Sequence, residues 1–190
     1  MSAADSQEQY VNELMRKRTK VTEFRQVITK GNNDVWGAGL ADFTSYATDN
    51  DGYMYALVVI DAFSRYAWAQ PLKTKTPAAV WSAFQTILDD ANSMPERLWV
   101  DQGAEFYNKL WTDKLKQLDI ARYSTYSEYN VSVAERFILT LKTNIFRLFL
   151  LKGTHNWVNI LQDQLGDYNK SRQATIGMTP TTHESSQPEL

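Results

Sequence analysis

The sequence contains no cysteine and only two histidines, His155 and His183. A disulfide framework, a thiolate zinc site and a histidine-rich metal cluster are therefore excluded. The metal chemistry that stays open is the binding of hard divalent cations by carboxylates. No apolar run approaches the roughly 18 residues that are needed to cross a bilayer, so we expect no membrane association.

The chain also lacks a strong excess of charge of either sign, with a net charge of −2 and a pI of about 5.7. Such a balance argues mildly against nucleic-acid binding, because affinity for DNA comes largely from lysine and arginine on phosphates. Basic residues are nevertheless grouped. Residues 16–30 carry six basic side chains against one acid, and residues 135–152 carry four against one. We therefore expect local basic faces on a near-neutral body.

What the sequence does contain is enough apolar material for one packed core. Of its 190 residues, 43% are hydrophobic and 13% aromatic, which is far from the composition of a disordered chain. Residues 1–33 are polar and are expected to form a partly helical N-terminal arm. The core is predicted over residues 34–182, and residues 183–190 are expected to be a flexible tail. We place the protein among intracellular soluble proteins.

Hydrophobic patterning predicts three strands in a meander, followed by alternating strands and helices. Thr76-Pro77 has the sequence of a helix start, with a capping residue before a first-turn proline. This order predicts an α/β fold with a mixed five-stranded sheet flanked by helices, compatible with an RNase H-like domain. The predicted strands are residues 35–46, 53–62, 65–72, 97–101 and 120–124, and the predicted helices are residues 77–92, 108–118, 131–152 and 156–168.

Carboxylates at predicted strand ends are the residues most suggestive of chemistry. Asp42 falls in or at the end of the first predicted strand. Asp101 directly follows the short apolar run of residues 98–100. An ionised carboxylate beside a buried strand is costly unless it is paired or binds a cation. Glu135 falls in the first turns of the long helix, where the helix dipole favours its charge. Asp61 also ends an apolar strand, so position alone does not choose between Asp61 and Asp42.

Three motifs resemble those of a known family. Residues 57–66 read LVVIDAFSRY, residues 100–106 read VDQGAEF, and residues 133–142 read VAERFILTLK. In this order, with 33 residues between Asp101 and Glu135, they resemble the catalytic core of retroviral-type DDE integrases. The residues of these motifs most resemble those in the integrases of Maverick (Polinton) transposons. The resemblance extends over about residues 25–181 and implies the RNase H-like fold.

The resemblance implies metal-dependent phosphoryl transfer on DNA, with 3′-end processing followed by strand transfer during integration of element DNA. Asp42, Asp101 and Glu135 would be the catalytic carboxylates and would hold two Mg²⁺ or Mn²⁺ ions. Paired ions activate one oxygen and stabilise the leaving oxygen in such reactions. A generic nuclease acting on RNA–DNA hybrids is a further reading, but the sequence shows no feature for binding a hybrid.

The same resemblance implies which partners the protein binds and which residues contact DNA. Lys142, Arg136 and Gln102 would contact DNA, and the partners would be double-stranded DNA ends and target DNA. Integrase cores usually dimerise, so we expect a homodimer formed through helical faces, to which exposed aromatics on the first helix and around Trp111 would contribute. The expected location is the nucleus, or the cytoplasm or a viral factory before integration.

The sequence departs from the family pattern at positions that bear on activity. The Maverick pattern has an aspartate three residues after the tryptophan, and some retroviral cores place the catalytic aspartate at that offset. Here that residue is Gly39, and we favour Asp42, six residues after Trp36, as the first carboxylate. Ile138 and Leu139 replace polar and basic residues after Glu135. These departures keep a second hypothesis open: a domesticated or weakened integrase-fold module that acts through DNA binding or through a protein partner.

Overall fold

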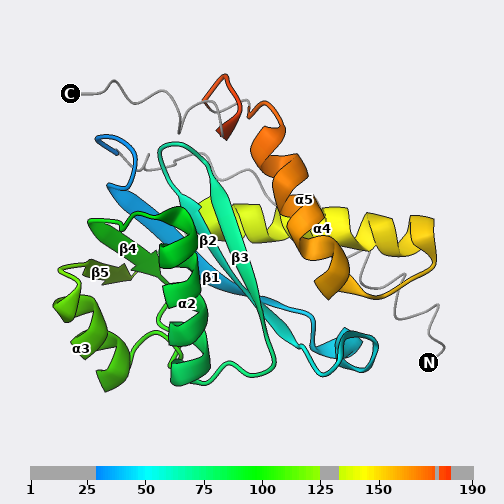
Figure 1. Cartoon of the computed structure of the whole chain (residues 1–190), viewed down its shortest axis with the longest axis horizontal. Helices are drawn as coiled ribbons and strands as arrows, with labels where there is room; N and C mark the ends of the chain where they lie inside the picture. Colours follow the sequence, from blue (N-terminus) through cyan, green and yellow to red (C-terminus); the bar gives the residue numbers. More distant parts are fainter. Residues whose placement is uncertain (1–28, 125–132, 174–175, 181–190) are drawn as a thin grey trace, which may run out of the picture.

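A mixed five-stranded sheet lies at the centre of the molecule, in the order β3-β2-β1-β4-β5, with helices on both faces (Figure 1). The structure is a computed structural model that describes residues 29–124, 133–173 and 176–180. Its elements are β1 (Val35–Asp42), the 3-10 helix η1 (Thr44–Asn50), β2 (Tyr55–Asp61), β3 (Ala67–Leu72), α2 (Pro77–Ala91), β4 (Arg97–Val100), α3 (Lys109–Gln117), β5 (Ala121–Ser124), α4 (Val133–Lys152) and α5 (Trp157–Lys170).

The predicted mixed α/β sheet is confirmed, and each predicted strand and helix falls close to an observed one. The main difference is that β1 ends at Asp42 rather than continuing to residue 46. The Asp42 carboxylate accepts a hydrogen bond from the Thr44 amide at 2.8 Å, which turns the chain into η1. Residues 1–28 of the predicted arm and the whole predicted tail lie outside the described residues. Within the described part, no helix is long and apolar enough to cross a membrane.

The two faces of the sheet bury separate hydrophobic clusters. Residues of α2 and α3 pack against one face, and residues of α4 and α5 pack against the other. Successive side chains of a strand point to opposite faces. In β1, Trp36 and Ala38 accordingly join the α2–α3 cluster, and Ala41 joins the α4–α5 cluster. This alternation fixes which β1 side chains can approach α4.

The edge strand β3 is covered by side chains of α5. Asn169, only 7% exposed, accepts from the Ala67 amide at 3.0 Å and donates to the Ala67 carbonyl at 2.9 Å. About two turns earlier in the helix, Gln162 donates to the Ala69 carbonyl at 2.9 Å. An uncovered strand edge invites pairing with another chain. These amides satisfy the edge and hold α5 against the sheet.

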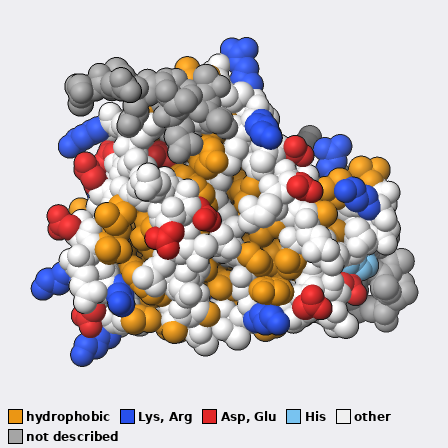
Figure 2. Space-filling view, viewed as in Figure 1, with side chains coloured by type: hydrophobic (Ala, Val, Ile, Leu, Met, Phe, Trp, Pro, Cys, Tyr) orange, Lys and Arg blue, Asp and Glu red, His pale blue; other side chains and the backbone are white. Residues whose placement is uncertain are grey.

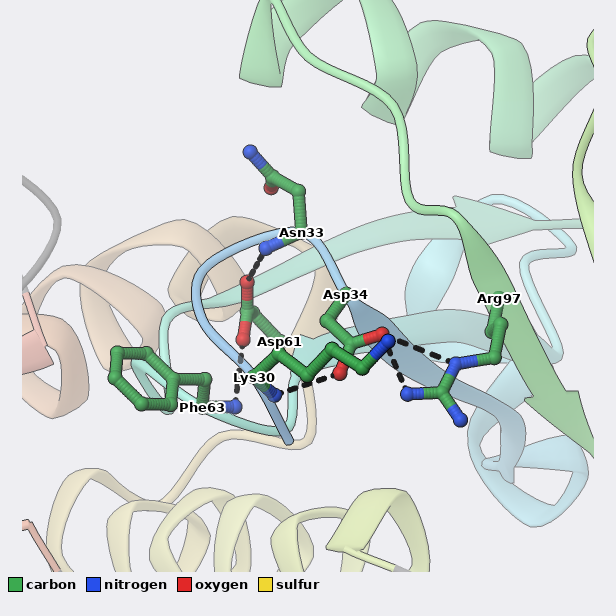
Figure 3. Close-up of polar contacts among 6 residues, drawn as sticks. All are labelled: Lys30, Asn33, Asp34, Asp61, Phe63 and Arg97. Atoms are coloured by element: carbon green, nitrogen blue, oxygen red, sulfur yellow. Dashed lines mark hydrogen bonds and ion pairs between the residues drawn. The ribbon is translucent and has the colours of Figure 1, made fainter. Parts of the chain in front are cut away.

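Two buried carboxylates organise the entry to β1 (Figure 3). Asp61, at the end of β2, accepts from the backbone amides of Asn33, Phe63 and Ser64. Asp34 accepts from the Arg97 guanidinium, with Nε at 3.0 Å, and from the Lys30 amide at 2.7 Å. Asp61 therefore has a structural role, and the strand-end position that it shares with Asp42 in the sequence does not indicate chemistry.

We expect Asn169→Ala to destabilise the protein by roughly 1–3 kcal/mol, because both backbone groups of Ala67 would lose their buried partner. The matched control is Asn159→Ala on the same helix, where the side chain is exposed. Urea unfolding monitored by circular dichroism measures both. Equal losses in the two variants would show that the Asn169 bonds do not stabilise the fold.

The hydrogen bond from Arg97 holds the pKa of Asp34 below its ordinary value of 3.8. A carboxyl group whose pKa is lower in the folded state stabilises the fold above its unfolded pKa. That stabilisation is lost as the pH falls through the folded value. Asp34→Asn should therefore lower the free energy of unfolding at pH 7, and the gap to the natural protein should narrow below about pH 4. Unfolding free energies that differ by the same amount at pH 7 and pH 3 would contradict this.

Candidate functional site

Asp101 follows directly after β4 and is exposed to solvent. Its Oδ1 accepts from the Gly103 amide at 3.1 Å, which turns the chain away from the strand and leaves the carboxylate at the sheet edge. The neighbouring Gln102 donates to the Ser124 hydroxyl at 3.4 Å and links this turn to the end of β5. The turn therefore presents Asp101 where a ligand or substrate can reach it.

The register of the sheet places Gly39 beside Asp101. β1 and β4 are parallel, and their last paired residues are Gly37 and Trp99. Since parallel strands advance together, two further steps bring Gly39 level with Asp101. Helix α4 crosses the strand at this point. A Cβ added to Gly37 would lie 3.3 Å from the Ala134 Cβ, and one added to Gly39 would lie 3.0 Å from the Ile138 Cδ1. Gly39 thus occupies the position between the β4 carboxylate and α4.

Asp42, the predicted first carboxylate, is not brought to this position. It lies three residues beyond Gly39, or roughly 10 Å along an extended strand. Its side chain also belongs to the other face, because even-numbered β1 residues point toward α2 and α3. Its pairing partner Tyr55 packs against that same cluster. The carboxylates of Asp42 and Asp101 are both exposed and each accepts from the amide two residues ahead, so the strand position and the sheet face separate Asp42 from Asp101.

Glu135 lies in the first turn of α4, between the two residues that contact β1. It is exposed, as Asp101 is. The two carboxylates therefore border the Gly39 position from different elements, Asp101 from β4 and Glu135 from α4. The structure brings two of the three predicted site residues to one region of the sheet and leaves Asp42 on its far side.

A divalent ion is the cofactor that the sequence resemblance implies, and the residues present do not fit its expected site. Carboxylate oxygens are the right donors for Mg²⁺ or Mn²⁺. Across the described ranges, however, no group of three or more His, Cys, Asp or Glu side chains lies close enough to hold a metal ion. At the central position Gly39 supplies no ligand atom, and Ile138 lines it with a methyl group.

Two of the predicted DNA-contact residues directly follow predicted carboxylates in the chain: Gln102 follows Asp101, and Arg136 follows Glu135. Gln102 lies at the β4–β5 end, and Arg136 lies exposed in the first turn of α4. Lys142, nearly two turns later, is half-buried, with its Nζ 5.7 Å from the ring centre of Phe43 and 5.8 Å from that of Phe146. Cation–π contacts of this kind hold an ammonium group against the protein surface. Basic and acidic side chains are both spread over the face seen in Figure 2.

The expectation that aromatics on the first helix and around Trp111 are exposed is wrong. Trp111 is fully buried and donates from Nε1 to the Pro77 carbonyl at 3.2 Å. Trp81 on α2 is only 4% exposed. These aromatics belong to the core between α2 and α3, as tryptophan usually does, and are not available at a dimer surface. The sequence signal for burial was the apolar spacing of α2, which places Trp81 on the same helix face as Phe84 and Leu88.

One polar residue near the site was not assigned any role from the sequence. Arg65 lies in the β2–β3 hairpin, inside the LVVIDAFSRY motif, with φ of 65°. The motif marked this residue as part of a resemblance, but nothing in the sequence showed that its side chain is half-buried and interacts electrostatically with Tyr168 of α5 and Arg136 of α4. Only the folded arrangement of the three elements shows this.

Known proteins resemble this chain in sequence and in fold. A family model for the integrase core domain matches residues 31–127. An uncharacterised transposon-derived protein of Caenorhabditis elegans is 32% identical over 139 residues, covering 73% of this chain and 49% of that protein. The Pol polyprotein of radiation murine leukemia virus is 30% identical over 122 residues, covering 63% of this chain and 21% of the polyprotein. The chain thus spans about half, or less, of these relatives.

Solved structures show the same fold at low sequence identity. The HTLV-2 integrase catalytic core domain in complex with magnesium, in a dimeric form, has a TM-score of 0.68 at 17% identity, covering 84% of this chain and all of that one. Integrase in the simian T-cell lymphotropic virus intasome, bound to a PP2A regulatory subunit, has a TM-score of 0.75 at 17% identity, with coverage of 92% and 62%. With a family match over about half of its length, the chain belongs to the integrase core family.

Proposed function

We propose that this chain is an integrase core that binds DNA but does not carry out metal-dependent strand transfer on its own. The observation that supports the proposal is the position of Gly39. It stands level with Asp101 and beneath Ile138, where a ligand would have to face both Asp101 and α4. Two-metal phosphoryl transfer depends on carboxylates that fix both ions. A glycine at the centre leaves only the two flanking carboxylates.

The DNA-binding part of the proposal follows from family membership and from the charge of α4. Arg136, Lys142, Arg147 and Lys152 lie along one helix that carries a single acid, Glu135. Such a helix can contact phosphates although the whole chain has a net charge of −2. The partners proposed are double-stranded DNA ends and target DNA, with a protein partner as the alternative.

The second candidate function is full 3′-end processing and strand transfer with Mg²⁺ or Mn²⁺. It is favoured by the intact surroundings of Asp101 and Glu135, which border one position from β4 and α4. It requires a third ligand from outside the Gly39 position, so it predicts activity that depends on another carboxylate. The two candidate functions therefore predict different effects on strand transfer when a carboxylate other than Asp101 and Glu135 is mutated.

Three further proposals accompany the function. We place the source among Maverick-type transposons, which the similarity to a transposon-derived nematode protein supports. We propose a homodimer, in keeping with the dimeric form of the HTLV-2 core. We propose action in the nucleus, where the DNA partners are.

The test of the proposed function restores the missing ligand. We expect the natural chain to show no Mg²⁺- or Mn²⁺-dependent strand transfer on labelled duplex ends. The double change Gly39→Asp with Ile138→Asn should raise the rate by roughly a hundred-fold or more, because a metal site contributes several kcal/mol to such reactions. Ile138 is changed as well because its methyl group would lie 3.0 Å from the new Cβ.

The matched control is Gly39→Asn with Ile138→Asn, which has nearly the same volume but no carboxylate and should stay inactive. Adding Asp101→Asn to the restored variant should abolish the gain. Strand transfer by the natural chain that disappears in Asp42→Asn would overturn the proposal and support the second candidate function.

A further inference from the structure

The loop between β3 and α2 (Figure 1) presents an exposed threonine that is followed by proline. Lys73, Thr74, Lys75 and Thr76 are all exposed, and no backbone hydrogen bond joins residues 73–75 to the described part of the chain. A residue before proline is held in an extended conformation, and Thr76 accordingly has φ of −64° and ψ of 146°. The loop is therefore an extended segment that another protein can reach.

The hydroxyl of Thr76 is only loosely engaged by the fold. Its Oγ accepts from the Ala79 amide at 3.4 Å and lies 3.3 Å from the Oγ of Thr74. Both distances are longer than those of typical hydrogen bonds between these atom types. Little is therefore lost when this hydroxyl turns toward another molecule.

A second Thr-Pro pair shows what the fold does to the same dipeptide elsewhere. Serine or threonine precedes proline at only two places in the sequence, Thr76-Pro77 and Thr179-Pro180. Thr179 is half-buried and has an interaction of its own, and Pro180 is buried. Thr76, in contrast, is exposed, and Pro77 is only half-buried. An enzyme that recognises threonine and proline together can therefore reach the first pair and not the second.

Two lysines in the loop supply positive charge beside Thr76. The Lys73 Nζ lies 5.0 Å from the ring centre of Tyr53, and the Lys75 Nζ lies 5.8 Å from that of Tyr55. Cation–π contacts at exposed sites are weak, whereas hydrogen bonds between an ammonium group and a phosphate are among the strong ones. A phosphate group on Thr76 would therefore draw these ammonium groups to itself.

We propose that Thr76 is a phosphorylation site for a proline-directed protein kinase. The kinase transfers the γ-phosphoryl group of a nucleoside triphosphate to the Thr76 Oγ. The Oγ–P bond forms, the bond to the leaving nucleoside diphosphate breaks, and the hydroxyl proton passes to the catalytic base of the kinase. The phosphate adds a charge of about −1.5 to −2 at neutral pH, which offsets the two positive charges of Lys73 and Lys75. The modification thus changes a basic loop into a nearly neutral one.

Incubation of the folded chain with a proline-directed protein kinase, Mg²⁺ and ATP tests the site, with the modified residue located by mass spectrometry. We expect phosphate on Thr76 and none on Thr179. Thr76→Asn should abolish incorporation, and it should leave the fold intact because asparagine is also a good helix-capping residue. The matched control Thr74→Asn changes the other exposed threonine of the loop and should leave incorporation unchanged. A folded natural chain that carries no phosphate on Thr76, or carries it on Thr179 alone, would overturn the proposal.

The melting temperature tests whether the loop holds the phosphate. The phosphorylated chain should melt roughly 2–4 °C higher than the unmodified one, because the phosphate meets the two lysines beside the start of α2. This gain should shrink in the double variant Lys73→Gln with Lys75→Gln. A melting temperature that falls on phosphorylation would overturn the proposed contacts with the lysines. Neither measurement involves DNA or strand transfer, so this proposal and the proposed function fail separately.

Discussion

The parallel pairing of β1 with β4 beneath α4 decides which side chains can meet in this protein. Because the two strands advance together, the residue level with Asp101 is fixed once Trp36 is paired with Leu98. Because strand side chains alternate, only odd-numbered residues of β1 face α4 there. Both conditions select Gly39 and exclude Asp42. The close contact of Ile138 with that position shows that the space is lined by apolar packing rather than by ligands.

Most of the fold could be predicted from the sequence, because it depends on local patterns. The apolar runs of β2 and β4, the Thr76-Pro77 helix start and the turn after Asp101 all lie in short stretches whose chemistry points to one conformation. The residues of the candidate site were harder to predict. Asp101 and Glu135 stand in well-matched motifs, but the choice between Gly39 and Asp42 depended on the register between strands that are about 60 residues apart in the chain. Counting from Trp36 offered both positions, and only the pairing distinguishes them.

The strand-end carboxylates also show how similar sequence positions acquire different roles. Asp61 is buried with three amide partners, Asp42 accepts from a turn amide on the α2–α3 side, and Asp101 is exposed at the end of β4. Asp34, which follows the Asn32-Asn33 turn, proved to be buried against Arg97. Asp61 and Asp34 are buried and accept several hydrogen bonds each, whereas Asp42 and Asp101 are exposed and each accept from one amide, so burial separates the two pairs.

The central claim, that Gly39 occupies the place of the missing first ligand, is tested most directly by anomalous diffraction from crystals soaked in Mn²⁺. In the Gly39→Asp, Ile138→Asn variant, we expect an anomalous peak within coordination distance of the carboxylate oxygens of residue 39 and Asp101. The natural chain should show no peak bridged by Asp42. A Mn²⁺ ion held jointly by Asp42, Asp101 and Glu135 in the natural chain would contradict the account.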